Sequence, residues 1–238
     1  MVTMNEHVSK RFDSELENLR SRVMQMGGLV ETQISRAIES FVSGDQDLMQ
    51  QVIADDHQVN GLEVSIDDDC AHIIARRQPT AGDLRMVMAV SKIVTDLERI
   101  GDEAAKIARM GKEIYQRDKL LIPRLTDIRK VGGIGITMLR DVLDAFVRLD
   151  VSDATRIIRE DAAVDDQFRG ILRQLITYMM EDPRTISTAL DIVFIAKAIE
   201  RIGDHAKNIA EDVIYIVKGT DVRHIAIDQI EAAPSADV

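Results

Sequence analysis

Residues 98–102 of this chain read Glu-Arg-Ile-Gly-Asp, and residues 200–204 read Glu-Arg-Ile-Gly-Asp again. The apolar frame around the two pentads also matches at an offset of 102 residues, as Ile93 and Ile195 illustrate. Self-similarity at a fixed offset indicates an internal repeat, in which each copy folds as one supersecondary unit. We therefore expect a molecule built from two similar halves.

The repeat extends beyond the pentads and is helical in character. Gly27-Gly28 matches Gly132-Gly133, and Val59 matches Val164, at an offset of 105 residues. Apolar residues recur every three to four positions, which predicts amphipathic helices. Six helices are expected, at about residues 8–42, 46–77, 81–117, 124–149, 152–180 and 184–218. The fifth is expected to begin after a cap at Ser152 or Asp153.

The predicted fold class is all-α, a six-helix array of two pseudo-symmetric three-helix bundles. We expect the first three-helix repeat over residues 1–118 and the second over residues 119–220, with a flexible tail over residues 221–238. Only 3% of the 238 residues are aromatic, and Trp is absent, so the core must be aliphatic. Long runs without Gly or Pro favour long helices.

The net charge and the cysteine content limit the possible partners and the cellular compartment. A net charge of −11 argues against a nucleic-acid partner, because phosphates repel an acidic surface. The single Cys70 excludes an intramolecular disulfide and fits a reducing compartment. The sequence shows no signal peptide and no apolar run of membrane-spanning length, so we expect a cytoplasmic location.

The acids of the pentads are candidate metal ligands. On a helical wheel, Glu98 and Asp102 lie about 40° apart, with the apolar residues of their helix roughly opposite. Glu200 and Asp204 repeat this layout, so all four acids are expected to face away from the bundle core. Like charges one turn apart repel each other, and a bound cation would compensate this repulsion. Carboxylates suit hard ions such as Mg, Ca, Mn and oxidised iron.

Neighbouring helices offer further charged candidates. Four acids at or near matching repeat positions could complete a coordination sphere: Asp55, Asp56, Asp161 and Asp165. Arg99 and Arg201 either orient the acids, contact phosphate or form surface ion pairs. Gly101 and Gly203 would allow another helix or a ligand to approach closely. The competing interpretation is a solvated acidic helix face with no ligand.

The chain carries no convincing catalytic constellation, so we expect a protein that is not an enzyme. It lacks a Gly-x-Ser-x-Gly motif and a Walker-type phosphate loop. The alternative from another class is a carboxylate-bridged di-iron enzyme on a helical bundle. Such sites use Glu-x-x-His motifs, and this sequence contains none. A purely structural scaffold with solvated acids is the third possibility.

Three segments resemble the PhoU family. Residues 96–104, their echo at 198–206, and the segment Pro-Thr-Ala-Gly-Asp-Leu-Arg at 79–85 carry the resemblance, which covers essentially the whole chain. PhoU proteins accompany bacterial high-affinity phosphate transporters. One departure is Asn60, where the second half has Asp165, and this leaves ligation from the second helix in doubt.

The resemblance implies a function and a set of partners. It implies a negative regulator of the phosphate-starvation regulon and of phosphate uptake, which acts as an adaptor between the ATP-binding subunit of the phosphate ABC transporter and a sensor histidine kinase. It implies a homodimer located at the inner membrane only through its partners. It also implies a metal ion cluster of iron, or of another divalent cation such as Mg, Mn or Zn, held by Glu98, Asp102, Glu200 and Asp204. Arg85 falls on the family's Pro-x-Ala-x-Asp-Leu-Arg motif and is a candidate for binding an anion or a partner.

Overall fold

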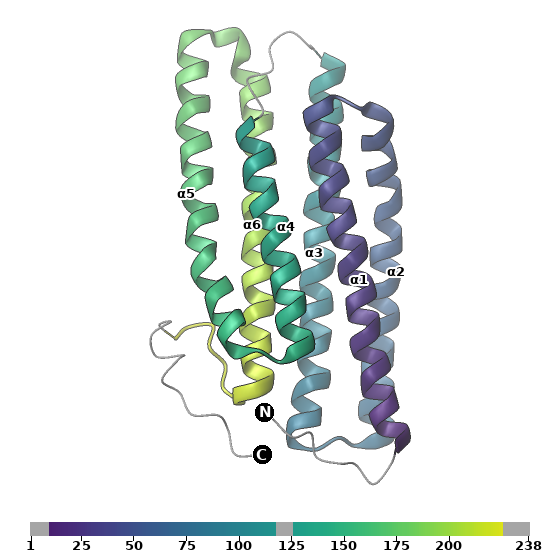
Figure 1. Ribbon diagram of the computed structural model, residues 1–238. Helices are drawn as coiled ribbons and strands as arrows, with labels where there is room; N and C mark the ends of the chain where they lie inside the picture. Colours follow the sequence, from purple (N-terminus) through teal and green to yellow (C-terminus); the bar gives the residue numbers. More distant parts are fainter. Residues whose placement is uncertain (1–9, 118–125, 226–238) are drawn as a thin grey trace.

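The computed structural model describes residues 10–117 and 126–225, and every regular element in these ranges is helical (Figure 1). The first half consists of α1 (Lys10–Ser43), α2 (Gln46–Arg77) and α3 (Ala81–Arg117). The second half consists of α4 (Thr126–Arg148), α5 (Val151–Glu181) and α6 (Ile186–Lys218), with a short 3-10 helix, η2 (Pro183–Thr185), before α6. The all-α prediction is confirmed. The expected boundary at residues 118 and 119 lies outside the described residues.

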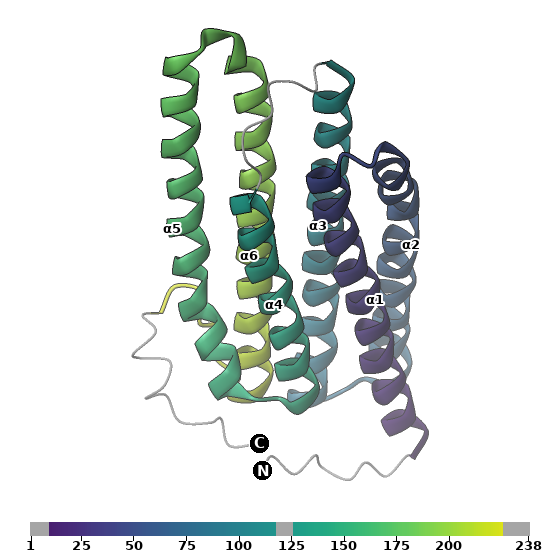
Figure 2. The same ribbon diagram turned by 45° about the horizontal axis from the view of Figure 1, so that its top comes forward.

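The two halves lie side by side, and α2 and α5 form the outer edges (Figures 1 and 2). α3 and α6 contact each other along the middle of the molecule, and α1 contacts α4. α3 therefore packs against α1, α2 and α6, and α6 packs against α3, α4 and α5. This arrangement buries much more of α3 and α6 than a helix at the edge of a bundle would bury.

The N-terminal cap of the second helix is the same in the two halves. Asp45 caps α2, and its side chain accepts a hydrogen bond from the backbone N–H of Leu48 at 2.9 Å. Asp150 caps α5 in the same way, accepting from the N–H of Asp153 at 3.1 Å. The predicted cap at Ser152 or Asp153 is therefore wrong. A left-handed residue ends the preceding turn, Leu149 with φ 53°, and places Asp150 at the cap.

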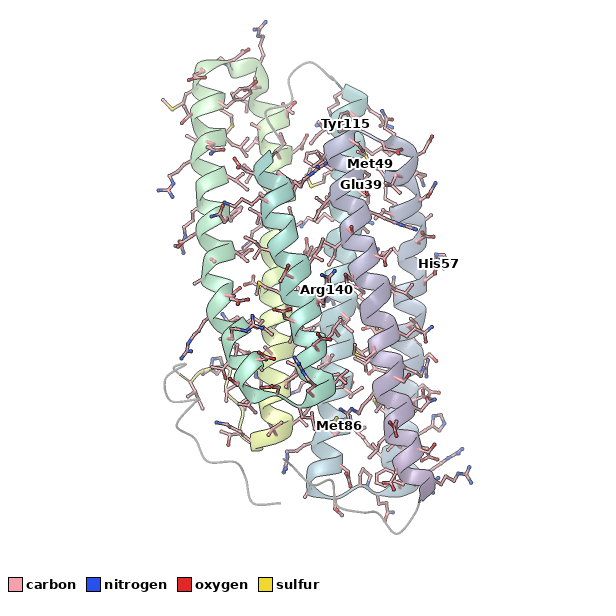
Figure 3. The ribbon with its side chains drawn as sticks, in the orientation of Figure 1. Glu39, Met49, His57, Met86, Tyr115 and Arg140 are labelled. Carbon is pink, nitrogen blue, oxygen red and sulfur yellow. The ribbon has the colours of Figure 1, made fainter. Side chains whose placement is uncertain are left out.

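Two glycines allow α1 and α4 to cross closely. A Cβ added to Gly27 would lie 2.5 Å from Cδ1 of Leu143, and one on Gly132 would clash with Ile38. Because each glycine lacks a Cβ, an aliphatic side chain of the other half can pack directly against its backbone. A side chain at either position would exclude this contact. Arg140 of α4 forms an ion pair with Glu31 of α1 across the same pair of helices, and Figure 3 shows Arg140 between them.

The ends of the long helices are tied to the core. Tyr115 donates a hydrogen bond from its hydroxyl to the carbonyl oxygen of Phe41 at 2.9 Å, at the end of the bundle where Figure 3 also places Met49. At the other end, Val222, which lies in the segment expected to be a flexible tail, is 3% exposed. The rest of the expected tail, residues 226–238, lies outside the described part of the chain. None of the described helices is both long and apolar enough to cross a membrane.

Candidate functional site

The first pentad lies between α2 and α3, in a region that we call the first seam. Its carboxylates are Asp56, Glu63, Asp67, Glu98 and Asp102. Two hydrogen bonds fix the α2 side of this seam. Ser91 donates to Asp67 Oδ1 at 2.6 Å, and the amide nitrogen of Gln33 donates to Asp56 Oδ1 at 2.8 Å.

Negative charge accumulates in the first seam. Burial raises the pKa of Glu98 above its ordinary value, and the carboxylates of Asp102 and Glu63 raise it further. Burial also raises the pKa of Glu63, with Asp67 as the next cause. Arg99 opposes these effects from 3.5 Å to Glu98 and 3.7 Å to Asp102. Arg99 is exposed and contacts two of the five carboxylates of this seam.

The second pentad lies between α5 and α6, in a region that we call the second seam. Its carboxylates are Asp161, Asp165, Glu200 and Asp204. Lys197 donates to Glu200 Oε1 at 2.5 Å, and Lys207 donates to Asp161 Oδ2 at 2.8 Å. Burial raises the pKa of Asp204, and Glu200 and Asp161 add to the shift. The second seam therefore contains its own cations.

The expectation that all four pentad acids face away from the bundle is wrong. Glu200 is only 8% exposed, and the Glu98 side chain is 15% exposed. Asp102 and Asp204 are half-buried at the rims of the seams. The wheel assumed one buried arc per helix, whereas α3 and α6 are each covered by three neighbouring helices.

The pentad glycines bring the helices of each seam together. A Cβ on Gly101 would lie 3.1 Å from Gln33 Oε1 and 3.3 Å from Val59 Cγ1. A Cβ on Gly203 would lie 3.5 Å from Val164 Cγ1, and Val164 is the repeat counterpart of Val59. The expected close approach is confirmed at Gly101, where the approaching elements are helices of the same half, whereas an added Cβ at Gly203 would make an ordinary contact.

The additional acidic candidates separate into two groups. Asp56, Asp161 and Asp165 lie in the seams, whereas Asp55 faces Arg36 of α1 at 3.7 Å. Sequence reasoning missed Glu63 and Asp67 of the first seam. Their spacing gives the signal, because residues 56, 63 and 67 fall on one face of α2 at intervals of seven and four.

The candidate arginines do not share one environment. Arg201 leaves the second seam and contacts Glu103 of α3 at 2.9 Å. Arg99 stays over the acids of its own pentad. Arg85 lies in the first turn of α3, about 20 Å along the helix from Glu98. Its buried Nε has no hydrogen-bond partner.

Polar contacts also join the two halves at positions where the repeats differ in sequence. His205 Nδ1 lies 2.7 Å from Asp96 Oδ1, and Asn208 donates to the same oxygen at 3.2 Å. In the repeat, Asp96 corresponds to Ala198, and His205 corresponds to Glu103. The divergent positions therefore serve the contact between α3 and α6.

The donor chemistry of the seams suits a hard cation, since carboxylate and amide oxygens are ligands that Mg, Mn and iron accept. Among residues 10–117 and 126–225, no group of three or more His, Cys, Asp and Glu side chains is arranged to hold an ion. Binding would therefore require seam carboxylates to rotate toward one point.

The sequence and the fold both match one family. The family model described as PhoU domain matches the chain twice, at residues 23–110 and 128–213. The chain belongs to the PhoU family. The resemblance noted in the sequence is thus confirmed, and the family model assigns one PhoU domain to each half.

Curated relatives match over nearly the full length. The chain is 50% identical to the phosphate-specific transport system accessory protein PhoU of Escherichia coli (strain K12), covering 97% of this chain and 95% of that protein. It is 46% identical to a PhoU homolog of Pseudomonas aeruginosa, covering 96% and 94%. These relatives are named as accessory proteins, so the family is not one of enzymes.

Solved structures share the architecture. The crystal structure of PhoU from Pseudomonas aeruginosa superposes with a TM-score of 0.84 at 46% identity, covering 88% of this chain and all (100%) of that chain. The phosphate transport system regulatory protein PhoU from Streptococcus pneumoniae superposes with a TM-score of 0.83 at 29% identity, covering 89% and 99%. The six-helix arrangement is therefore that of the PhoU fold.

Proposed function

We propose that this chain is a cytoplasmic negative regulator of phosphate uptake and of the phosphate-starvation response. The observation that carries the proposal is the similarity over nearly the full length to proteins named as accessory components of phosphate-specific transport. The chain would act as an adaptor between the ATP-binding subunit of a phosphate ABC transporter and a sensor histidine kinase. It would work as a homodimer, at the membrane only through these partners.

We also propose that the seams hold a metal ion. The support is chemical: buried carboxylates repel one another in the first seam, and the oxygen of Gln33 is buried there without a hydrogen-bond partner. Oxygen donors favour Mg, Mn or iron over zinc, which more often takes nitrogen and sulfur ligands. A bound cation would neutralise the seam, while Arg99 would orient Glu98 and Asp102.

The regulatory proposal is tested by deleting the gene in its own host and following a reporter fused to a phosphate-starvation promoter. In phosphate-rich medium we expect the deletion to derepress the reporter and a plasmid copy of the chain to restore repression. An unchanged reporter in the deletion strain would contradict the regulatory role.

The adaptor proposal needs a separate measurement. Affinity capture of the tagged chain from cells grown in high and low phosphate should recover the transporter's ATP-binding subunit and the histidine kinase. Recovery of neither protein under both conditions would contradict the coupling role, and sedimentation of the purified chain tests the dimer.

A further inference from the structure

Exposed apolar side chains gather where α5 meets α6, in a region that we call the hairpin tip. This end of the second half extends beyond the start of α4 (Figures 1 and 2). Five large apolar side chains of the tip are between 43% and 79% exposed: Ile176, Met180, Ile186, Leu190 and Phe194. Single exposed apolar residues are ordinary, whereas a contiguous group of them marks a surface that contacts another molecule.

The apolar side chains of the tip form one stripe on each helix. Residues four positions apart lie on the same side of a helix, one turn after another. The α5 stripe contains Leu172, Ile176 and Met180, and the α6 stripe contains Ile186, Leu190 and Phe194. Leu172 is half-buried, and the other five side chains are exposed.

The two stripes lie side by side at one level of the antiparallel helix pair. Phe168 precedes the α5 stripe by one turn, and Lys197 lies seven positions after Leu190 on the same side of α6. The Phe168 ring is 5.6 Å from the Lys197 ammonium, so both stripes point to the same face. At the other end, the Thr185 hydroxyl donates to the carbonyl oxygen of Tyr178 at 3.4 Å. The tip therefore presents one apolar surface built from two helices.

The first half shows that the fold does not require this surface. At the positions of Leu172, Ile176 and Met180, α2 has Asp67, Ala71 and Ala75. On α3, the position of Phe194 is Lys92, which faces Asp212 at 3.6 Å. α3 retains exposed Leu84 and Met88, but α2 places no apolar stripe beside them. Because the same helix pair forms in the first half without this stripe, packing within a half does not account for the α5 stripe.

Positive charge borders the α5 stripe. Arg173 is exposed and donates to the backbone carbonyl oxygen of Arg169 at 3.3 Å, and no acid within residues 10–117 and 126–225 pairs with it. Residues 169–190 contain three arginines and two acids, although the net charge of the chain is −11. One of those acids, Asp182, is neutralised by Arg184 at 2.9 Å. The tip is therefore complementary to a partner surface that is both apolar and acidic.

We propose that the hairpin tip is the docking surface for an amphipathic helix of another protein, one with acidic residues along the edge of its apolar face. The apolar stripes of two neighbouring helices accommodate the apolar face of a third helix. Arg173 would form charge-assisted hydrogen bonds with its acids. The inference rests on the adaptor part of the proposed function and states the chemistry of one contact that the adaptor makes.

The charges of the tip favour this occupant over two others. Glu181 and Asp182, at the connection between α5 and α6, would repel an anionic lipid surface. A second copy docked tip to tip would place the same arginines against each other, since a twofold interface pairs identical surfaces. A helix of another protein with acidic edges meets neither objection.

The occupant is identified by photocrosslinking in the host, with p-benzoylphenylalanine in place of Leu190 of the full-length chain. We expect a crosslink to a peptide of another protein, which mass spectrometry should identify as a helical segment with apolar residues three and four positions apart and Asp or Glu beside them. The matched control places the same crosslinker at Met88, the counterpart of Leu190, and should capture much less of this peptide. Crosslinks to phospholipid, to a second copy or to a basic segment, equal capture at Met88, or no crosslink would each overturn the proposal.

Binding strength is then measured by fluorescence anisotropy, with the captured segment as a labelled synthetic peptide and the purified full-length chain. Ile176→Glu with Phe194→Glu should weaken binding about tenfold, since both changes place charge in the apolar contact. The matched pair Leu84→Glu with Met88→Glu, in the first half, should leave affinity unchanged. Arg173→Glu should weaken binding about fivefold, and by less at high salt. Equal losses in the two pairs, or undiminished binding by Arg173→Glu, would overturn the proposal, and circular dichroism of every variant controls for folding.

Failure of this inference is separable from failure of the proposed function. A chain that represses the phosphate-starvation reporter and recovers its partners, but gives no crosslink at position 190, would retain the adaptor role without this docking surface. A deletion that leaves the reporter unchanged, in a host where position 190 still captures an acidic amphipathic helix, would retain the docking surface and remove the regulatory role.

Discussion

The first and second seams share the same backbone geometry but differ in their charged side chains. Both bring a glycine of the pentad against a valine of the neighbouring helix, Gly101 against Val59 and Gly203 against Val164. The first seam leaves its carboxylates facing one another, whereas lysines pair with the acids of the second. The duplication thus preserved the packing that positions the site, while the charged side chains diverged.

The α3–α6 contact shows why some divergence is required. Asp96 faces His205, whose repeat counterpart in the first half is Glu103. An unaltered copy would place a glutamate at position 205 against Asp96, and two acids at that distance would repel each other. Glu103 in turn faces Arg201 at 2.9 Å. Unequal residues at equivalent positions make the interface between the halves complementary.

The largest expected effect concerns Asp212 on α6, whose counterpart on α3 is the apolar Met110. Burial raises the pKa of Asp212 from 3.8 to about 6, although Lys92 lies 3.6 Å away and opposes the shift. The folded chain therefore holds this proton more tightly than the unfolded chain. Its contribution to the unfolding free energy falls as pH rises from about 4 to about 6, by about 3 kcal/mol in total.

Asp212→Asn should remove that dependence. Urea unfolding of the variant and the parent at several pH values between 4 and 8 gives the difference directly. We expect the parent to lose stability relative to the variant as pH rises. If the unfolding free energies of the two proteins changed with pH in parallel, burial would not raise the pKa of Asp212.

The next effect concerns the ion pair in the second seam. Lys207→Met leaves the buried carboxylate of Asp161 without its partner and should reduce the unfolding free energy by about 2 kcal/mol at pH 7. The matched control is Lys207→Met with Asp161→Asn, which should recover most of the loss because the unpaired charge is gone. If the Lys207→Met variant were as stable as the parent, then water would be solvating Asp161 in place of the lysine.

Much of the fold was accessible from the sequence, because periodicity and turn residues act locally. The predicted limits of residues 46–77 and 81–117 coincide with α2 and α3. The lateral neighbours of a helix are set by tertiary packing, so the wheel could not show that Glu200 is buried. The pairing of Lys207 with Asp161 joins residues 46 positions apart and has no local signal. Metal ligation by the pentads stays a prediction.

A smaller effect distinguishes the two pentad glutamates by its sign. Glu98→Gln removes a carboxylate whose pKa is raised by burial and by its acidic neighbours, so it should stabilise the metal-free chain by about 0.5 kcal/mol. Glu200→Gln removes the acceptor of Lys197 and should destabilise the chain by about 1.5 kcal/mol. Both are measured by chemical unfolding at pH 7 with chelator present. Shifts of the same sign would contradict the distinction between the seams.

The smallest effect concerns the pentad glycines. Alanine favours a helix interior by about 1 kcal/mol over glycine, so Gly203→Ala should stabilise the chain, since its Cβ would meet Val164 at an ordinary 3.5 Å. At Gly101 the added Cβ would press on Gln33 Oε1 at 3.1 Å, and the shift of Gln33 should cancel most of that gain. Thermal unfolding of the two variants compares these positions directly. An equal gain at both would mean that Gln33 moves freely, and the first seam would then lack the fixed oxygen that distinguishes it from the second.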